Sequence, residues 1–334
     1  MTWSPSKRID TFPRTHTQPA QKNKMESTSP TMPITLDKRF HHSTPTHSFS
    51  IAWTALGSAS NTPLIFIHGT PWSSHVWLPF ARALSRKYRV YLCDNPGFGQ
   101  SPAEKLESGT TGFKPESETE RLDGDLARQS EAFAALFKHW GATEDWTTRP
   151  HVVAHDHGGL MSLRAHLVHE CRYASLCLID VVAIGPFGHA LFQSVAENAG
   201  AFEKMPDVVF EDMLESYIRH AAYTALDSRT VEMLKAPWMR EGGKAGFVRQ
   251  LCQAAHRSTG EVEGRYADVG REMHIKIIWG KQDSWIPVSD AHRLGAALGA
   301  KEVVEVDGAG HLIMYDQPGQ LGVELAVWLT AMGD

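Results

Sequence analysis

One stretch of this chain decides its fold: Val152-Val153-Ala154-His155-Asp156-His157-Gly158-Gly159. An apolar run ends at Asp156, two glycines follow, and helical spacing begins at once. This pattern is typical of a buried parallel strand that enters a helix through a sharp turn, known as a nucleophile elbow. The turn lifts one side chain above the edge of the sheet. The sequence therefore predicts that Asp156 stands at such a position, where a serine is more usual.

Short apolar runs alternate with helical patterns on both sides of this turn. Strands are expected at residues 48–54, 63–67, 88–93, 151–154, 174–179, 273–279 and 302–306. Helices are expected at residues 75–86, 121–140, 158–170, 288–298 and 320–331. This alternation predicts an α/β fold with a mostly parallel central sheet flanked by helices.

The alternation stops between residues 183 and 267, where helical patterns occur without a convincing strand. We expect this stretch to be a helical cap, inserted after the strand that ends near Asp180. The core is then split into residues 36–182 and 268–334. Residues 1–35 are rich in Ser, Thr, Pro and Gln and poor in large aliphatic residues, which predicts a disordered tail.

Composition excludes several classes of function. The 334 residues carry a net charge of −5 without a long basic block, so nucleic-acid binding has no electrostatic support. No apolar run reaches the ~18 residues of a membrane span. The four cysteines form no CxxC pair, which favours free thiols in a reducing compartment such as the cytoplasm. The basic residues of the tail leave a mitochondrial location open. We expect a small-molecule substrate, no cofactor and no metal, and the composition leaves a homodimer open.

Three further motifs lie where an enzyme with such a turn would need them. His68-Gly69-Thr70-Pro71 follows an expected strand, Trp279-Gly280-Lys281-Gln282-Asp283 follows a late strand, and His311 lies in a Gly-rich loop after the last one. Asp180, at the end of the strand after the turn, is an alternative acid to Asp283.

These residue types indicate a two-step hydrolysis. An ionised Asp156 would attack an sp³ carbon and form an ester with it. His311 would then activate water, with Asp283 or Asp180 holding the imidazole. The backbone N–H groups of Thr70 and His157 would form the oxyanion or leaving-group site. Asp156 and Asp283 could each also serve as a cap, but their register with His311 favours catalysis.

The set of motifs resembles the α/β-hydrolase superfamily, in the branch of epoxide hydrolases and of haloalkane and haloacetate dehalogenases. The resemblance covers residues 36–331 and includes the chain order of nucleophile, acid and histidine. It implies a cap that contacts the substrate. Candidate substrate-binding residues are Trp72, Tyr217, Tyr223 and Tyr266, the tyrosines because epoxide hydrolases protonate the epoxide oxygen with two cap tyrosines.

At two positions this chain differs from the pattern of haloalkane dehalogenases, and the differences favour epoxide hydrolysis over dehalogenation. Haloalkane dehalogenases usually bind halide through a Trp and an Asn, at the positions where this chain has His157 and Thr70. The sequence therefore favours an epoxide hydrolase, with a haloalkane or haloacid dehalogenase as the alternative. His157 also resembles the corresponding residue of cofactor-free dioxygenases. This leaves open a lyase or dioxygenase that uses His311 as its base.

Overall fold

The computed structural model describes residues 35–45, 47–106, 124–186, 190–253 and 257–333. The expected tail, except for Thr35, lies outside these residues, as do residues 107–123. Among the described residues, no helix combines the length and the apolar character needed to cross a bilayer.

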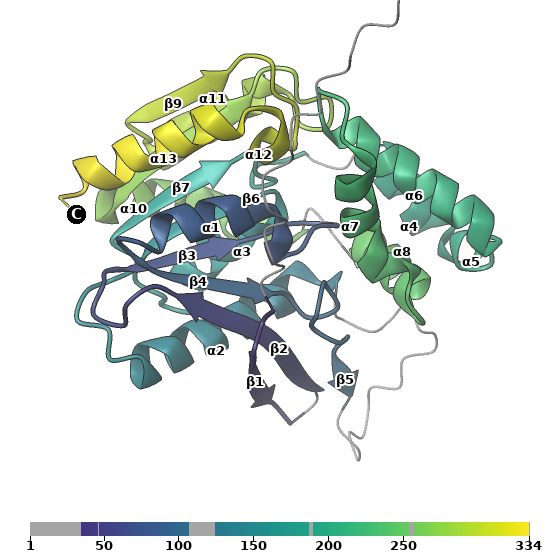
Figure 1. Ribbon diagram of the computed structural model, residues 1–334, viewed down its shortest axis with the longest axis horizontal. Helices are drawn as coiled ribbons and strands as arrows, with labels where there is room; N and C mark the ends of the chain where they lie inside the picture. The colour runs from purple at the N-terminus through teal and green to yellow at the C-terminus, as the bar shows by residue number, and fades with distance from the viewer. Residues whose placement is uncertain (1–34, 46, 107–123, 187–189, 254–256, 334) are drawn as a thin grey trace, which may run out of the picture. The chain divides into compact units, whose positions relative to one another are not determined.

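The centre of the protein is a nine-stranded sheet in the order β1-β2-β4-β3-β6-β7-β8-β9, with β5 paired to β2 (Figure 1). The strands are β1 (Lys38–Ser43), β2 (His47–Leu56), β3 (Pro63–Ile67), β4 (Arg89–Asp94), β5 (Lys105–Leu106), β6 (His151–His155), β7 (Ser175–Ile179), β8 (His274–Gly280) and β9 (Glu302–Val306). From β4 to β9 every neighbouring pair is parallel, whereas β2 pairs antiparallel with β1, β4 and β5. The predicted α/β class and mostly parallel sheet are confirmed.

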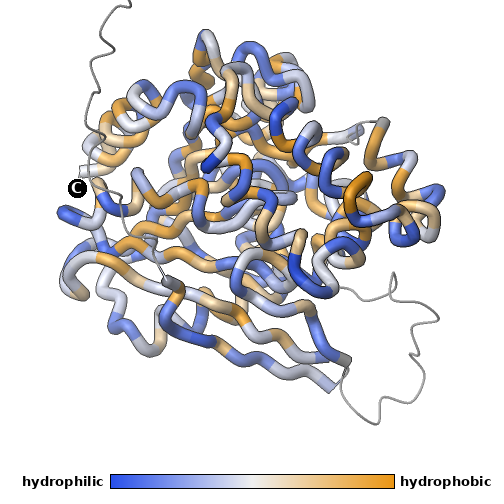
Figure 2. The backbone as a smooth tube through the Cα atoms, turned by 45° about the vertical axis from the view of Figure 1, so that its right-hand side comes forward, coloured by the Kyte–Doolittle hydropathy of each residue, from blue (hydrophilic) through white to orange (hydrophobic). Residues whose placement is uncertain are grey.

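The central strands alternate their side chains between two hydrophobic cores, because successive residues of a strand point to opposite faces. Phe66 and Val153 pack in one core, and Ile65 and Val152 in the other. Since both faces are covered, β3 and β6 are buried along their whole length and are mostly apolar (Figure 2).

Helices cover both faces of the sheet. One core includes side chains of α1 (Leu78–Leu84) and α13 (Pro318–Ala331), which follows the short α12 (Ile313–Asp316). The other core includes side chains of α2 (Leu126–Thr143), α3 (His157–Leu167), α10 (Tyr266–Glu272) and α11 (Val288–Leu298). Figure 1 shows α1 and α13 in front of the sheet.

The described elements between β7 and β8 are all helical, and α4 to α8 lie beside the carboxyl ends of the strands (Figure 1). Besides α10, which packs against the sheet, these elements are α4 (Ala190–Glu197), α5 (Ala199–Glu203), α6 (Asp207–Ala221), α7 (Ser228–Met239), α8 (Gly243–Gln253), α9 (Arg257–Gly260) and the 3₁₀ turn η4 (Glu263–Arg265). The sequence did not predict α4 or α7. In α7, Pro237 lies inside the helix, and a proline is normally read as a helix breaker.

Other differences concern the ends of elements. The sequence did not predict β1, whose alternating exposed residues are polar and which lies at the edge of the sheet. The helix expected at 75–86 divides into the 3₁₀ turn η1 (Ser74–Trp77) and α1. The helix expected from residue 121 begins at Leu126, because the Asp125 side chain accepts hydrogen bonds from two backbone N–H groups and caps it.

The strand-to-helix turn depends on Gly159, because the side chain of Val181 fills the space beside its α-carbon. A β-carbon on Gly159 would overlap the side chain of Val181, whereas one on Gly200 in α5 would meet nothing within 4 Å. We expect Gly159→Ala to lower the free energy of unfolding by about 1–3 kcal/mol through overpacking. The matched Gly200→Ala should be neutral or stabilise by up to about 1 kcal/mol. Urea denaturation measures both, and equal stability of the two variants would contradict the close packing.

Candidate active site

Asp156 stands at the junction of β6 and α3 in a backbone conformation that few side chains adopt. Its φ is 53° and its ψ is −131°, in a region where most L-residues are strained. The approach to β3 is also close, since a β-carbon on Gly69 would overlap the Asp156 carboxylate. The sharp turn expected from the sequence is therefore present, and the strain is concentrated at the residue that carries the carboxylate.

One carboxylate oxygen of Asp156 is held by backbone donors. Its Oδ1 accepts a hydrogen bond from the N–H of Thr70 at 2.9 Å and a short one from the N–H of His157. The His157 ring adds a contact, with Nδ1 3.0 Å from Oδ1. The structure thus brings together the two N–H groups expected to form an oxyanion site, and they converge on a single oxygen.

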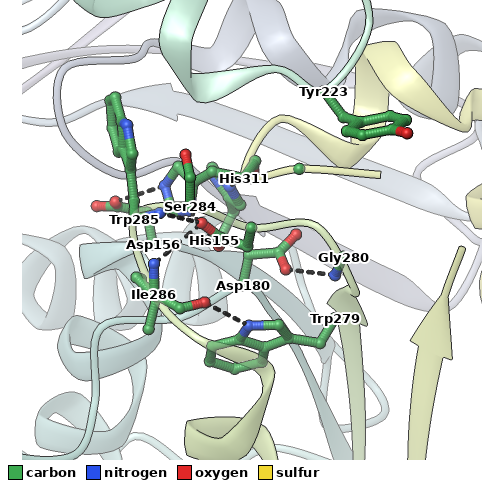
Figure 3. Close-up of polar contacts among 12 residues, drawn as sticks. His155, Asp156, Asp180, Tyr223, Trp279, Gly280, Ser284, Trp285, Ile286 and His311 are labelled. Carbon is green, nitrogen blue, oxygen red and sulfur yellow. Dashed lines mark hydrogen bonds and ion pairs between the residues drawn. The ribbon is translucent and has the colours of Figure 1, made fainter. Parts of the chain in front are cut away.

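The other oxygen of Asp156 contacts the late histidine. Oδ2 lies 2.9 Å from Nε2 of His311 (Figure 3). Nδ1 of His311 lies 2.9 Å from Oδ2 of Asp283. Asp283 is in turn fixed by the N–H groups of Trp285 and Ile286, which donate to its Oδ1 at 2.7 and 3.0 Å. Three distant segments therefore meet in one line of hydrogen bonds with the imidazole between two carboxylates.

The charges of this line shift its pKa values. Burial by itself would raise the pKa of Asp156, but His157 and His311 outweigh it and hold the pKa well below its ordinary value. Burial by itself would lower the pKa of His311, but the charge of Asp283 and the hydrogen bonds of Asp156 and Asp283 raise it to about 10. At neutral pH the site therefore holds an imidazolium between two carboxylates.

Asp180, the alternative acid, is fully buried beside this line (Figure 3). Its Oδ1 accepts a hydrogen bond from the N–H of Gly280 at 2.7 Å, and its Oδ2 has no partner among the described residues. Burial, together with the charge of Asp283, raises the pKa of Asp180 well above its ordinary value. Burial thus disfavours the charged form of Asp180, and the carboxylate that contacts His311 Nδ1 is that of Asp283.

His155 is a residue at the site to which the sequence analysis assigned no role. Its Nε2 lies 2.8 Å from the carbonyl oxygen of His311, so Nε2 carries the proton and donates it. Burial and the nearby His311 lower the pKa of His155 to about 3, so the ring stays neutral. The sequence marks His155 only by its position directly before Asp156. Its hydrogen-bond partner, His311, lies 156 residues away in the chain, so the residue pattern does not indicate the contact.

The candidate substrate-binding residues do not all reach the site. Trp72 is buried and its ring is stacked 5.9 Å from that of Trp285. Tyr217 of α6 is stacked 4.4 Å from Trp285, and the charge of Asp156 contributes, after burial, to raising the Tyr217 pKa. Both therefore lie close to the line of hydrogen bonds.

The structure does not bring Tyr223 or Tyr266 to the triad. Tyr223 is 58% exposed and is set apart from the Asp156 and His311 side chains (Figure 3). Tyr266 belongs to α10 and is buried in the hydrophobic core that also contains α2, α3 and α11. Its hydroxyl donates a hydrogen bond to the carbonyl oxygen of Ala183 at 2.5 Å. Both assignments are corrected on this geometry, because Tyr223 follows the end of α6 and Tyr266 lies in a core helix.

No group of three or more His, Cys, Asp or Glu side chains is placed to hold a metal ion in the described part of the chain. His155 and His157 lie on either side of Asp156, and each contacts a different partner.

A family model described as the alpha/beta hydrolase family matches residues 64–324, which include every segment of this site. The chain belongs to this family. The match covers most of the chain, including the sheet from β3 onward, and it confirms the resemblance drawn from the sequence at the level of the superfamily.

Known proteins similar to this α/β-hydrolase have different functions. One similar solved structure is the crystal structure of an alpha/beta hydrolase fold protein from Burkholderia ambifaria. Its sequence is 32% identical to this chain, its TM-score is 0.75, and the superposition covers 87% of this chain and 97% of that protein. The dihydrolipoyllysine-residue acetyltransferase component of the acetoin cleaving system of Pseudomonas putida is 26% identical over 284 residues, or 84% of this chain. Epoxide hydrolase 1 of Caenorhabditis elegans is 22% identical over 287 residues, or 82% of this chain. The chain spans 66% of the length of each of these two relatives.

The two acids beside His311 are separable by mutation. Asp283→Asn removes the charge bonded to Nδ1 and should reduce turnover by about 10²- to 10⁴-fold. Asp180→Asn keeps an oxygen for the Gly280 N–H and removes no hydrogen bond of His311, so turnover should change by less than about threefold. Steady-state kinetics of both variants tests this assignment, and the reverse ranking would make Asp180 the acid.

Proposed function

We propose that this α/β-hydrolase is an epoxide hydrolase that works through an alkyl ester on Asp156. The observation that carries the proposal is the hydrogen-bonded line from Asp283 through His311 to Asp156, with the second oxygen of Asp156 held by two backbone N–H groups. The likeness to Epoxide hydrolase 1, at 22% identity, supports the same reaction class.

In the first step, Asp156 acts as the nucleophile. Its low pKa keeps it ionised, and its Oδ2 attacks a ring carbon of the epoxide. The C–O bond of the ring breaks, and the oxygen leaves as an alkoxide that takes up a proton. The backbone N–H groups of Thr70 and His157 meanwhile hold Oδ1 and keep the carboxylate oriented.

In the second step, water breaks the ester. Alkylation removes the charge of Asp156, one of the two carboxylates that raise the pKa of His311. The imidazolium can then release its proton, which replaces the proton given to the alkoxide, and His311 becomes a neutral base. His311 then takes a proton from water, and the hydroxide attacks Cγ of Asp156. Negative charge develops on Oδ1, between the N–H groups of Thr70 and His157. The bond between Cγ and Oδ2 then breaks, and the departing Oδ2 takes the second proton of the water. The diol leaves with this oxygen, Asp156 is again a carboxylate that contains the oxygen of the water, and His311 is again an imidazolium.

The nucleophile type disfavours acyl transfer. A carboxylate that attacks an ester or thioester gives an anhydride, which is no easier to break than the substrate. The raised pKa of His311 also disfavours a lyase or dioxygenase that would use the free imidazole as a base, because that base is protonated until Asp156 is consumed.

Tyr217 is the proposed donor to the leaving oxygen. Burial and the Asp156 charge raise its pKa, so the hydroxyl keeps its proton before reaction. When Asp156 is converted to the ester, that charge disappears and the pKa of Tyr217 falls. The proton therefore becomes easier to release as the alkoxide forms.

The buried indole of Trp72 supports carbon–halogen cleavage as a second candidate. Its Nε1 is buried and has no hydrogen-bond partner among the described residues. An indole N–H donates a hydrogen bond but does not release its proton. It would stabilise a departing halide, which needs no proton, better than a departing alkoxide.

The covalent mechanism is tested by trapping the ester in His311→Gln. Because this variant lacks the base for the second step, an epoxide should add its whole mass to Asp156 and stay bound. A haloalkane or haloacid would instead add its mass minus that of HX. Intact-mass and peptide mass spectrometry after incubation with a panel of these compounds gives the readout.

Two variants control the trapping experiment. His292→Gln changes an exposed histidine on α11, paired with Glu305, and should turn over normally without accumulating an adduct. Asp156→Ala combined with His311→Gln should give no adduct. A stable protein that shows no adduct with any compound of the panel would refute the aspartyl-ester mechanism.

The two reactions are separated by substitutions at the proposed leaving-group donors. Tyr217→Phe should reduce ester formation with epoxides by about 10²-fold or more and leave haloalkanes within about threefold. If halide is the true leaving group, Trp72→Phe should instead reduce haloalkane reaction by about 10- to 100-fold. Single-turnover rates of adduct formation measure both, and full epoxide activity in Tyr217→Phe would exclude its role as the acid.

A further inference from the structure

Trp285 connects three parts of the site that the triad does not join. It lies two residues after Asp283, and its backbone N–H donates to Asp283 Oδ1 at 2.7 Å. Its half-buried indole is stacked on the imidazole of His311, with ring centroids 4.9 Å apart and 28° between the planes. Figure 3 draws both side chains beside Asp156.

The same indole reaches helix α6. Its ring is stacked at 4.4 Å and 25° on Tyr217, and its Nε1–H donates to Nδ1 of His220 at 3.0 Å. Trp72 is stacked on it at 5.9 Å and 16°. The indole is therefore oriented by a hydrogen bond and by rings from two other segments, and it has little freedom to turn away from His311.

An indole face attracts a cation because the π system carries negative charge on its face. His311 is cationic in the resting site, and it becomes cationic again when it takes the proton of water. The charged and titratable groups that face it are Asp156 and His155 on β6 and its turn, Asp283 after β8, and Asp180 after β7. Trp285 adds an uncharged contact, and this contact favours the imidazolium over the neutral ring.

We infer that Trp285 is a positioning residue, which stabilises the imidazolium of His311 and ties the orientation of this ring to α6 through His220. This inference rests on the proposed function for its kinetic consequence, because the imidazolium forms during ester hydrolysis. Its effect on the resting protein does not depend on that function.

The first test is the titration of His311 in the protein without substrate. The NMR signals of its ring are assigned by their absence in His311→Gln. Trp285→Leu removes the π face and should lower the titration midpoint of His311 by about 0.5–1.5 pH units. Trp285→Phe keeps a ring and should recover part of this shift. An unchanged midpoint in a folded Trp285→Leu protein would overturn the inference.

The second test separates the two chemical steps. Trp285→Leu should form the ester at a rate within about threefold of the native chain and hydrolyse it about tenfold more slowly, so that the adduct accumulates. Equal slowing of both steps, with a lower melting temperature, would indicate a merely structural role and count against the inference. Failure of His311→Gln to trap any adduct would refute the proposed function instead, while the titration would still decide the role of Trp285.

The hydrogen bond from the Trp285 indole to α6 is tested by substituting its acceptor, the exposed residue His220. His220→Ala removes the acceptor of the indole N–H, and His220→Asn offers an amide oxygen in a similar place. We expect His220→Ala to slow ester hydrolysis by about threefold and His220→Asn to restore it. Equal rates for His220→Ala and the native chain would show that α6 does not fix the indole through His220.

Discussion

The structure depends on holding one carboxylate in a fixed place at the carboxyl ends of the parallel strands. Asp156 has a positive φ, and its two oxygens have different partners: backbone N–H groups hold Oδ1, and His311 holds Oδ2. In the mechanism that we propose, this division lets one oxygen act as a nucleophile while the other remains in a site ready for negative charge. The close approach of Gly69 and Gly159 to neighbouring side chains makes the turn that carries it possible.

Burial gives this arrangement its electrostatic character. An isolated buried carboxylate would be protonated, and an isolated buried imidazole would be neutral. Placed together, Asp156 and His311 favour each other's charged form, and the charge of Asp283 adds to this at His311. Burial disfavours the charged form of the neighbouring Asp180 and lowers the pKa of His155 to about 3. Because Asp156 is one of the groups that raise the pKa of His311, the alkylation that we propose for Asp156 would lower that pKa.

The relatives of this chain illustrate that fold and reaction are separate questions. The names of its curated relatives include an acetyltransferase component and an epoxide hydrolase, and both match most of this chain at comparable identity. The acid at the turn, rather than the overall likeness, is therefore the feature on which the proposed chemistry rests. The residues that would distinguish an epoxide from a carbon–halogen bond, Tyr217 and Trp72, come from α6 and from the loop after β3.

The sequence by itself determined the sheet, the turn and the types of residue that could react. Strands such as β3 and β9, and the helix α11, have the bounds that the pattern predicts, because apolar periodicity is local. Only the tertiary structure decided that Asp283 rather than Asp180 bonds His311, that Tyr217 rather than Tyr223 or Tyr266 lies near Asp156, and that His155 and Trp285 contact His311. These are contacts between segments far apart in the chain. They follow from where the strands end in space and how the helices after β7 pack, which the spacing of residues does not encode.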